Sequence, residues 1–536
     1  MKSKILRTTI QRFIYLFSIM LLPICGMNAQ DTYKRNSNAD VQHYRFDLTV
    51  NDGSNEILGQ ALIKVNFDKD IDTFALDLIG KSNEFGMEIV EVLEDDKKAN
   101  YTFKEDKILI IPELKDLKER TFSIKYKGIP AKGLVMDTTM YGQRSIFGDN
   151  WPNLARYWLA CVDHPYDKAS VNFNVYAPEY YDVVATGIKT EESNLGNGMK
   201  LTSYNEPAPV ATKVMTIGVT KFAYRYLGKV DDIEVSAWVY PENRLEGFTD
   251  FDEATKILKY FSANIGPYSY AKLANMQAKT QWGGLENAGT ISYKEALITG
   301  NNNIQELMAH EIAHQWFGNS ATENDWNHVW LSEGFATYFA ILYQESVDGN
   351  EKRKAKLLQD KKEVIEYYQK NPSPIVDSSI KDPKKVLSRN TYQKGGWVLN
   401  MLRHQLGDEV FWEGIRQYYS TYKDANAMSS DFQKIMEEVS GKDLNGFFEQ
   451  WLYVKGYPEL KWGWKYKKGK LKISVKQLQK HHTFKFPIEF GIKTGDNIEI
   501  ISLDVESASE TFEIGLEDKP ESVLIDPEFW LLFEEK

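Results

Sequence analysis

The stretch His310-Glu311-Ile312-Ala313-His314, with Glu333 after eighteen further residues, decides what the middle of this 536-residue chain can form. If residues 304–317 are helical, His310 and His314 lie one turn apart on one face, so both imidazoles can bind one ion. Glu333 would be the third ligand, because His, His and Glu are an established set for catalytic zinc with a fourth position open to water. Glu311 would lie beside that water and exchange its proton.

The pentapeptide alone is weaker evidence, because a His-Glu-x-x-His pattern also occurs by chance on ordinary helices. The position of Glu333 strengthens the interpretation. It lies near the start of a second helical segment, residues 331–343, which a loop can fold back against the first. Together the two segments predict one zinc ion per chain, held by His310, His314 and Glu333.

The hydrophobic pattern changes twice along the chain. From about residue 40 to 225 apolar and polar residues alternate, as at Tyr44, Phe46 and Leu48, which is typical of strands. The middle mostly shows the three-to-four spacing of helices, and alternation returns after Gly456. We therefore predict a multidomain α+β protein, with an N-terminal β-sandwich-like domain at 30–228, a mainly helical zinc domain at 229–456 and a small C-terminal β-sandwich at 457–536.

Further elements are expected in the middle region. A strand should occupy residues 235–240, and helices should occupy 352–369, 394–406, 411–422 and 431–439. Residues 371–389 contain three prolines and predict a loop long enough to be functional.

Residues 1–29 have the layout of a secretory signal peptide. Four basic residues precede an apolar run at 13–24, and small or polar residues follow as far as Ala29, where we expect cleavage. The run is shorter than the roughly 20 residues of a membrane-spanning helix, so no stable membrane insertion is expected after cleavage. Lipoprotein anchoring at Cys25 is an alternative, but Ile24 before it fits a lipidation signal poorly. The mature protein is therefore expected to be periplasmic or secreted.

Charge and cysteine content exclude some partners. The formal net charge is −11, and it becomes −15 when the four basic residues of the signal peptide leave. The sequence shows no basic patch that would indicate nucleic acid as a partner. Of the two cysteines only Cys161 remains after cleavage, so no intrachain disulfide is possible and a buried thiol is expected.

A second motif lies upstream of the zinc segment, at Gly283-Gly284-Leu285-Glu286-Asn287. Two glycines before an acidic residue let the backbone come close to a ligand and leave its polar groups open for pairing with an extended peptide. Glu286 would then point into the cleft. An exposed turn with an incidental glutamate would explain this segment alone, but its place before a zinc helix favours a binding role.

These motifs, in this order and spacing, closely resemble the M1 family of zinc aminopeptidases, the gluzincins. The resemblance covers nearly all of the mature chain, and its landmarks are residues 44–48, 155–156, 163–165, 283–287, 310–319, 330–336, 392–396, 451 and 456–458. It implies a thermolysin-like catalytic domain. The chain ends soon after the third predicted domain, as in short bacterial members, so we expect an open cleft without a large helical C-terminal domain.

The resemblance also implies roles for individual residues. His310, His314 and Glu333 would hold zinc, and Glu311 would act as general base and then general acid. Glu286, with Gly283, Gly284 and Asn287 beside it, would bind the substrate, its carboxylate facing the free α-ammonium. Tyr392 would donate its hydroxyl to the oxyanion opposite zinc.

Two positions depart from the family pattern. Where many members carry a Gln-x-Glu or Gln-x-Gln pair, this chain has Asp149 and Trp151, so Asp149 or Asn150 is a candidate for contact with the amine. Where the family has methionine in Gly-Ala-Met-Glu-Asn, this chain has Leu285, which changes the first side-chain pocket.

The predicted function is hydrolysis of the first residue from peptides with a free N-terminus. Two alternatives remain on the same scaffold. One branch of the family adds epoxide hydrolase activity, and some relatives are inactive peptide-binding proteins. The complete set of His310, Glu311, His314, Glu333 and Tyr392 favours a working hydrolase.

Overall fold

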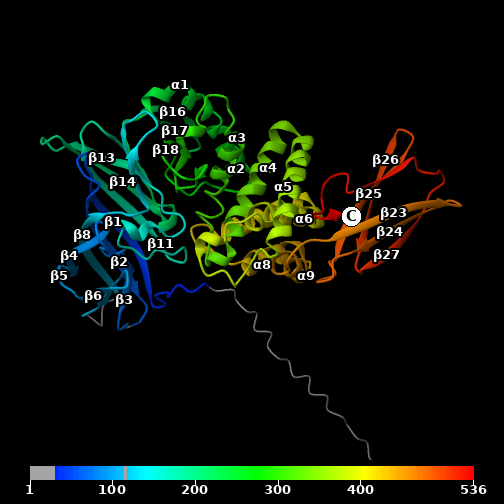
Figure 1. The fold of residues 1–536 in the computed structure, drawn as a ribbon, viewed down its shortest axis with the longest axis horizontal. Coiled ribbons are helices and arrows are strands. Elements are labelled where there is room, and N and C mark those ends of the chain that lie inside the picture. Colours follow the sequence, from blue (N-terminus) through cyan, green and yellow to red (C-terminus); the bar gives the residue numbers. More distant parts are fainter. Residues whose placement is uncertain (1–30, 70, 114–117) are drawn as a thin grey trace, which may run out of the picture.

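A computed structural model describes residues 31–69, 71–113 and 118–536. It places a β-rich region, a helical region and a second β-rich region side by side along the longest axis (Figure 1). The predicted fold class is therefore confirmed. The predicted signal peptide at 1–29, with Cys25, lies outside the described residues.

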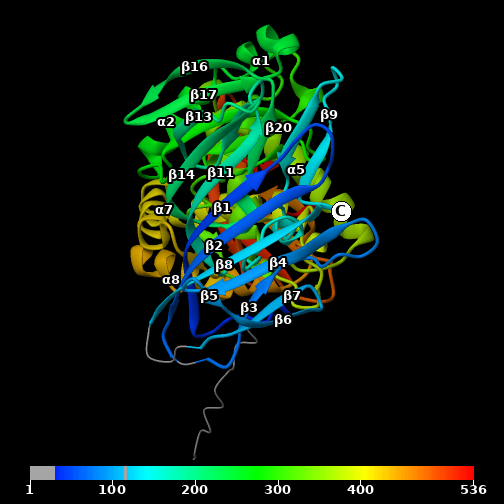
Figure 2. The ribbon, with the colours of Figure 1, turned by 90° about the vertical axis from the view of Figure 1, so that its left-hand side faces the viewer.

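The N-terminal region is built on an eight-stranded sheet, which faces the viewer in Figure 2. All its neighbouring strands are antiparallel except β1 and β11, which run parallel. In sheet order the strands are β13 (Ile188–Asn194), β14 (Met199–Ala211), β11 (Lys168–Pro178), β1 (Ala39–Thr49), β2 (Ile57–Phe67), β8 (Glu119–Ile129), β4 (Gly86–Glu94) and β5 (Lys97–Lys98). Tyr44, Phe46 and Leu48 all face the core, as their alternation predicts.

Two smaller sheets complete this region. They consist of β3 (Phe74–Asp77), β7 (Lys107–Ile111) and β6 (Asn100–Lys104), and of β12 (Asp182–Ala185), β15 (Ile217–Thr220), β10 (Arg144–Gly148) and β9 (Leu134–Thr138). Phe74 stacks on Phe122 of β8 with ring centroids 5.3 Å apart. The sheet of β3, β7 and β6 therefore packs on the eight-stranded sheet in a sandwich-like arrangement. Cys161 is a buried free thiol in the same core.

The middle region begins with a five-stranded sheet. Its order is β16 (Ala223–Val230), β17 (Ile233–Val239), β18 (Lys272–Ala278), β20 (Thr290–Lys294) and β19 (Gly284–Leu285). β17, β18 and β20 are parallel, and the two edge strands are antiparallel to their neighbours. The predicted boundary between residues 228 and 229 falls inside β16. The edge strand β19 brings Gly284 and Leu285 to the border of the site described below.

Helices cover this sheet and form the rest of the middle region. They are α1 (Arg244–Asp250), α2 (Ala254–Asn264), α3 (Gln305–Ala313), α4 (Trp330–Asp348), α5 (Asn350–Lys370), α6 (Gly395–Leu406), α7 (Asp408–Tyr422), α8 (Ser429–Ser440) and α9 (Asn445–Phe448). Every residue of α4 from Trp330 to Tyr343 is buried, so α4 is the central helix around which the others pack.

The helix predicted at 304–317 is shorter in the structure. α3 ends at Ala313, and His314 follows with helical backbone angles. The chain then turns, because the Gly318 amide donates to the Ala321 carbonyl and Gly318 has φ +112°. That left-handed backbone favours glycine and cannot continue a helix. His310 and His314 nevertheless keep their one-turn spacing.

The loop predicted at 371–389 is present, with one short 3₁₀ turn at Pro383–Lys385. It leads into a π-helical turn, Asn390–Lys394, which carries Tyr392 and continues directly into α6. Such turns widen a helix by one residue and are frequent at functional sites.

The C-terminal region consists of two small sheets. One contains β27 (Ser509–Gly515), β24 (Lys470–Gln477), β23 (Glu459–Lys467) and β29 (Glu534–Glu535), and the other contains β26 (Asn497–Val505), β25 (Phe486–Thr494) and β28 (Ser522–Ile525). Trp462 of the first meets Phe490 of the second with ring centroids 5.5 Å apart. No helix among the described residues is long and apolar enough to cross a membrane.

Candidate metal and substrate site

Three side chains converge where α3 packs on α4. The Nε2 atoms of His310 and His314 lie 3.0 Å apart, and Glu333 Oε2 lies 3.5 Å and 3.2 Å from them. Ligands bonded to zinc at about 2.0–2.1 Å in a tetrahedron lie about 3.3–3.4 Å from one another. The spacing of the three donor atoms therefore fits a single zinc ion, and these are the ligands that the motif predicts.

The surroundings of His314 fix which ring nitrogen faces the ion. Its Nδ1 lies 3.1 Å from the Phe317 carbonyl oxygen, so this nitrogen carries the proton and donates it there. The Ser332 hydroxyl lies 3.1 Å from the same nitrogen. Nε2 is then left with a free lone pair, as a metal ligand requires. Gly318 permits this contact, because a Cβ there would lie 2.1 Å from Ser332 Oγ.

Glu311 lies beside the three ligands and lines the same cavity. It is 4% exposed, and burial raises the pKa of its carboxyl well above the ordinary value. The neighbouring carboxylates of Glu286 and Glu333 raise this pKa further, while His314 opposes them. A carboxyl with a raised pKa is suited to both accepting and returning a proton.

Gly284 makes room for Glu311. A Cβ added to this glycine would lie 2.3 Å from Glu311 Oε1, so any side chain would displace the carboxylate. The edge strand β19 and the helix α3 therefore approach each other at this point only because residue 284 is glycine.

Tyr392 reaches the site from the π-helical turn. Its ring stacks on that of His310, with centroids 6.0 Å apart and planes 10° apart. Burial, together with the nearby carboxylates of Glu333 and Glu286, holds the pKa of Tyr392 well above its ordinary value. The hydroxyl therefore keeps its proton and is available as a hydrogen-bond donor.

Two glycines allow the π-helical turn that carries Tyr392 to approach α4 closely. A Cβ on Gly334 would lie 2.9 Å from backbone atoms of Gly395, so α4 and the start of α6 touch backbone to backbone. Gly334 adjoins the ligand Glu333, and Gly395 lies three residues after Tyr392. The contact therefore sets the distance between the ligand cluster and the tyrosine.

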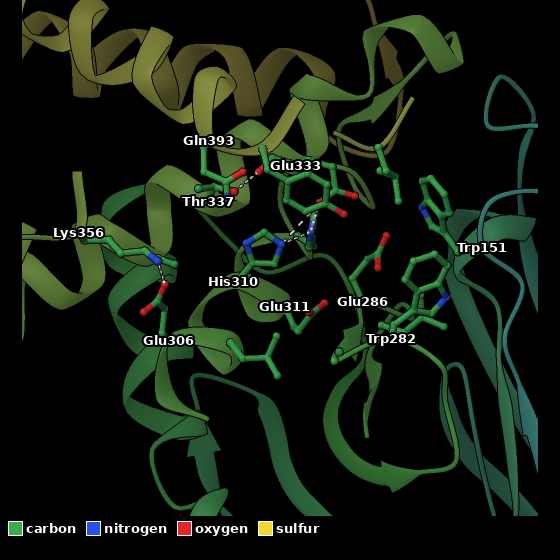
Figure 3. A pocket seen from close by; sticks show the side chains of 18 of the residues that line it. Trp151, Trp282, Glu286, Glu306, His310, Glu311, Glu333, Thr337, Lys356 and Gln393 are labelled. Atoms are coloured by element: carbon green, nitrogen blue, oxygen red, sulfur yellow. Dashed lines mark hydrogen bonds and ion pairs between the residues drawn. The ribbon is translucent and has the colours of Figure 1, made fainter. Parts of the chain in front are cut away.

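Glu286 follows the edge strand and points into the cavity (Figure 3). Its backbone carbonyl accepts hydrogen bonds from Gln315 Nε2 at 2.9 Å and Asn319 Nδ2 at 2.5 Å. Glu286 as a whole is 5% exposed, and its Oε1 has no hydrogen-bond partner among the described residues. A buried carboxylate held in this way favours a cation as its partner, because an unpaired buried charge is unfavourable.

Of the other residues predicted to bind the substrate, some line the cavity and some do not. Gly283 and Gly284 line the cavity, whereas Asn287 is held by Ser292 Oγ and does not. Asp149 does not line it either. Its carboxylate accepts hydrogen bonds from Thr280 Oγ1 and Trp282 Nε1, at 3.1 Å and 3.2 Å. Asp149 therefore holds Trp282 in place and does not itself line the cavity.

Asn150, the other candidate for contact with the amine, and His328, which lies between the ligands His314 and Glu333 in the sequence, both have structural partners. Asn150 donates to the carbonyls of Thr212 and Met215, inside the N-terminal region. His328 Nδ1 lies 2.7 Å from Ser429 Oγ and is buried. Neither belongs to the metal or cavity cluster.

The cavity has a volume of about 470 Å³ and two unlike ends. Trp151 and Trp282 stand on the side of Glu286, with ring centroids 6.0 Å apart (Figure 3). At the other end Lys356 pairs with Glu306 at 2.6 Å. No binding role was predicted for these four residues, nor for the lining residues Asn303, Leu307, Thr337, Ala340, Leu387 and Gln393. Three of them carried a local signal: Trp282 adjoins the two glycines, and Trp151 and Gln393 lie at positions compared with the family pattern.

Comparison with known proteins places the chain in a family. The model of the Peptidase M1 N-terminal domain matches residues 40–214, and that of the Peptidase family M1 domain matches residues 249–451. The second match contains the whole metal cluster and Tyr392. The chain belongs to peptidase family M1.

Among similar sequences, "Probable aminopeptidase 2" of Sulfurisphaera tokodaii is 26% identical over 395 residues, covering 70% of this chain and 49% of that protein. "Aminopeptidase M1" of Arabidopsis thaliana is 28% identical over 338 residues, covering 60% and 38%. This chain thus spans about half the length of such relatives. A crystal structure of an M1 zinc metallopeptidase from Deinococcus radiodurans has the same fold, with a TM-score of 0.66, 22% identity and coverage of 78% and 95%.

The ligand geometry predicts how the protein binds zinc. We expect one zinc ion per chain, measured by elemental analysis after dialysis. Glu333→Ala should weaken zinc affinity by more than about 100-fold, since even groups that only orient a ligand are worth about 10- to 100-fold. Wild-type affinity in Glu333→Ala would contradict the ligand assignment. Glu306→Ala removes a carboxylate that lies in the same cavity but outside the ligand set, and it should leave zinc binding unchanged.

Proposed function

We propose that this protein is a zinc-dependent aminopeptidase, which hydrolyses the first residue from peptides with a free N-terminus. The observation that carries this proposal is the buried carboxylate of Glu286 beside the cluster of His310, His314, Glu333 and Glu311. A hydrolytic site next to a cation-binding carboxylate selects peptides by their terminal ammonium. Several of the similar proteins are named as aminopeptidases, which supports the same activity.

Each of these residues would have its own role in hydrolysis. Zinc, when bound, supplies a Lewis acid that polarises the peptide carbonyl and the attacking water. Glu311 takes the proton of that water and delivers it to the leaving amine, which its raised pKa supports. Glu286 holds the ammonium, and Tyr392 donates its hydroxyl to the oxygen that gains negative charge.

The cavity also indicates how the peptide lies. With its ammonium at Glu286, the first side chain would rest against Trp151, Trp282 and Leu285, and later residues would run toward Lys356 and Glu306. An aromatic wall of this kind favours a large apolar or aromatic first residue. In a crystal structure of a mutant of the Deinococcus radiodurans enzyme, the bound substrate is Tyr-Ser-Ala, whose first residue is aromatic.

The two alternatives find less support. An inactive peptide-binding scaffold would have no need of a buried general base with a raised pKa. An epoxide hydrolase would have no need of a carboxylate for an ammonium. Export to the periplasm or beyond is also part of the proposal, and it rests only on the sequence of residues 1–29.

The general base gives a sharp test. Glu311→Gln should keep stoichiometric zinc but lower kcat for an L-phenylalanyl arylamide by at least about 100-fold, because general base catalysis contributes about 10²- to 10⁴-fold. Glu306→Gln changes a carboxylate on the same helix that pairs with Lys356, and its kcat should stay close to wild type. Undiminished turnover in Glu311→Gln would refute the mechanism.

Amine recognition gives a second test. Glu286→Ala should lower kcat/KM for the free phenylalanyl arylamide by about 100-fold or more, in line with the loss of one partner of a buried charge pair. The rate on the N-acetylated arylamide, already low, should change little. Should the variant discriminate against the acetylated compound as strongly as wild type does, Glu286 does not bind the amine.

The aromatic wall gives a third test. Trp282→Ala should reduce the preference for phenylalanyl over alanyl arylamide by about 10-fold or more, because differences in apolar pocket contacts are worth about 10- to 200-fold. Tyr224→Ala, which removes an exposed aromatic side chain from β16, should leave the ratio unchanged. An unaltered ratio in Trp282→Ala would remove this wall from the first-residue pocket.

A further inference from the structure

A lysine of the N-terminal region is buried against the catalytic region. Lys168 is the first residue of β11 and is 9% exposed. Its ammonium donates to the backbone carbonyls of Asn319 at 3.0 Å, Ser320 at 2.6 Å and Ala425 at 3.4 Å. These carbonyl oxygens belong to two separate loops of the catalytic region. Lys168 therefore joins three segments at one point.

The loop that Lys168 holds is also the loop that holds Glu286. Asn319 follows the metal ligand His314 by five residues, and its backbone N–H donates to the His314 carbonyl oxygen at 3.1 Å. Its side chain donates to the Glu286 carbonyl at 2.5 Å. A chain of direct hydrogen bonds thus runs from Lys168 through Asn319 to the backbone of Glu286.

The N-terminal region holds the same segment at a second point. The amide of Ala288, two residues after Glu286, donates to the Val214 carbonyl at 2.9 Å. The Thr290 hydroxyl donates to the Ala185 carbonyl at 3.0 Å. The segment from Glu286 to Thr290 is therefore fixed between the N-terminal region on one side and the Asn319 loop on the other.

A second buried lysine makes the assignment specific. Lys213 also crosses from the N-terminal to the catalytic region, but it pairs with the carboxylate of Glu323. That contact is a buried ion pair between the two regions, and it does not involve the loop that carries Asn319. The Lys168 Nζ instead donates to carbonyl oxygens, two of them from the loop that carries Asn319. Burial lowers the pKa of Lys168 to about 7, while the Asp424 carboxylate opposes that shift. The Nζ is a donor to these carbonyls with or without its charge, so the geometry of the contact restrains the loop.

We propose that Lys168 is a positioning residue for amine recognition, which acts on the carboxylate of Glu286 through Asn319. The proposal rests on the function proposed above. By this account the N-terminal region takes part in substrate selection, although among the residues that line the cavity only Trp151 comes from that region. Loss of the lysine should loosen the Asn319 loop, displace Glu286 and leave the ligand cluster itself in place.

The test compares two inhibitors that differ only in the amine. L-Phenylalanine hydroxamic acid and 3-phenylpropanohydroxamic acid carry the same metal-binding group and the same side chain. In the zinc-loaded wild-type protein, amine recognition by Glu286 is measured by the Kd of 3-phenylpropanohydroxamic acid divided by the Kd of L-phenylalanine hydroxamic acid. Lys168→Met keeps the length of the side chain and removes its donors. We expect this substitution to lower the ratio by about 10-fold, since small displacements from outside the site cost up to about 100-fold.

Controls separate the possible outcomes. Lys125→Met, which changes an exposed lysine paired with Glu91 in the same region, should leave the ratio unchanged. If Lys168→Met does not fold, Asn319→Ala cuts the next link with the lysine in place, and it should show the same selective loss. Equal weakening of both inhibitors, or an unchanged ratio in folded protein, would overturn the proposal. A wild-type protein that binds both inhibitors equally would instead refute the role of Glu286.

Discussion

The burial of three metal-binding side chains at the contact between α3 and α4 is the constraint on which the site depends. Donor atoms of two imidazoles and a carboxylate lie within 3.5 Å of one another, and the carboxylate belongs to the first turn of a helix that is buried along most of its length. Such polar groups are unfavourable in a core unless they share a charge partner. A bound zinc ion meets that requirement, and glycines at 284, 318 and 334 admit the neighbours that the arrangement needs.

The second half of the site depends on contacts between regions. Glu286 stands at a sheet edge, and its position is set by Gln315 and Asn319 from behind the metal cluster and by the N-terminal region from the other side. The metal cluster and Glu286 therefore share the loop that follows His314. This shared support keeps the cluster and the carboxylate at a fixed distance, as the proposed removal of a single residue from a peptide would require.

Much of this could be predicted from the sequence, because the decisive signals are local. Alternation predicted the outer β regions, and the spacing of His310, His314 and Glu333 predicted the ligand cluster. The helix end at Ala313 was missed, since it depends on a turn at Gly318. Asp149 and Trp282 meet only in the folded chain, so the support of one by the other could not be predicted. Lys168 likewise reaches a carbonyl 151 residues away, and nothing in its own segment indicates that partner.

The proposed site both cleaves a peptide bond and selects the bond one residue from a free amine. Mass spectrometry of a peptide with an aromatic first residue, incubated with the zinc-loaded protein, distinguishes this activity from cleavage elsewhere in the peptide. We expect products shortened one residue at a time from the N-terminus, no cleavage of the same peptide when acetylated, and no cleavage after chelation of zinc. Internal fragments, or equal cleavage of the acetylated peptide, would show that the amine does not set the position of cleavage.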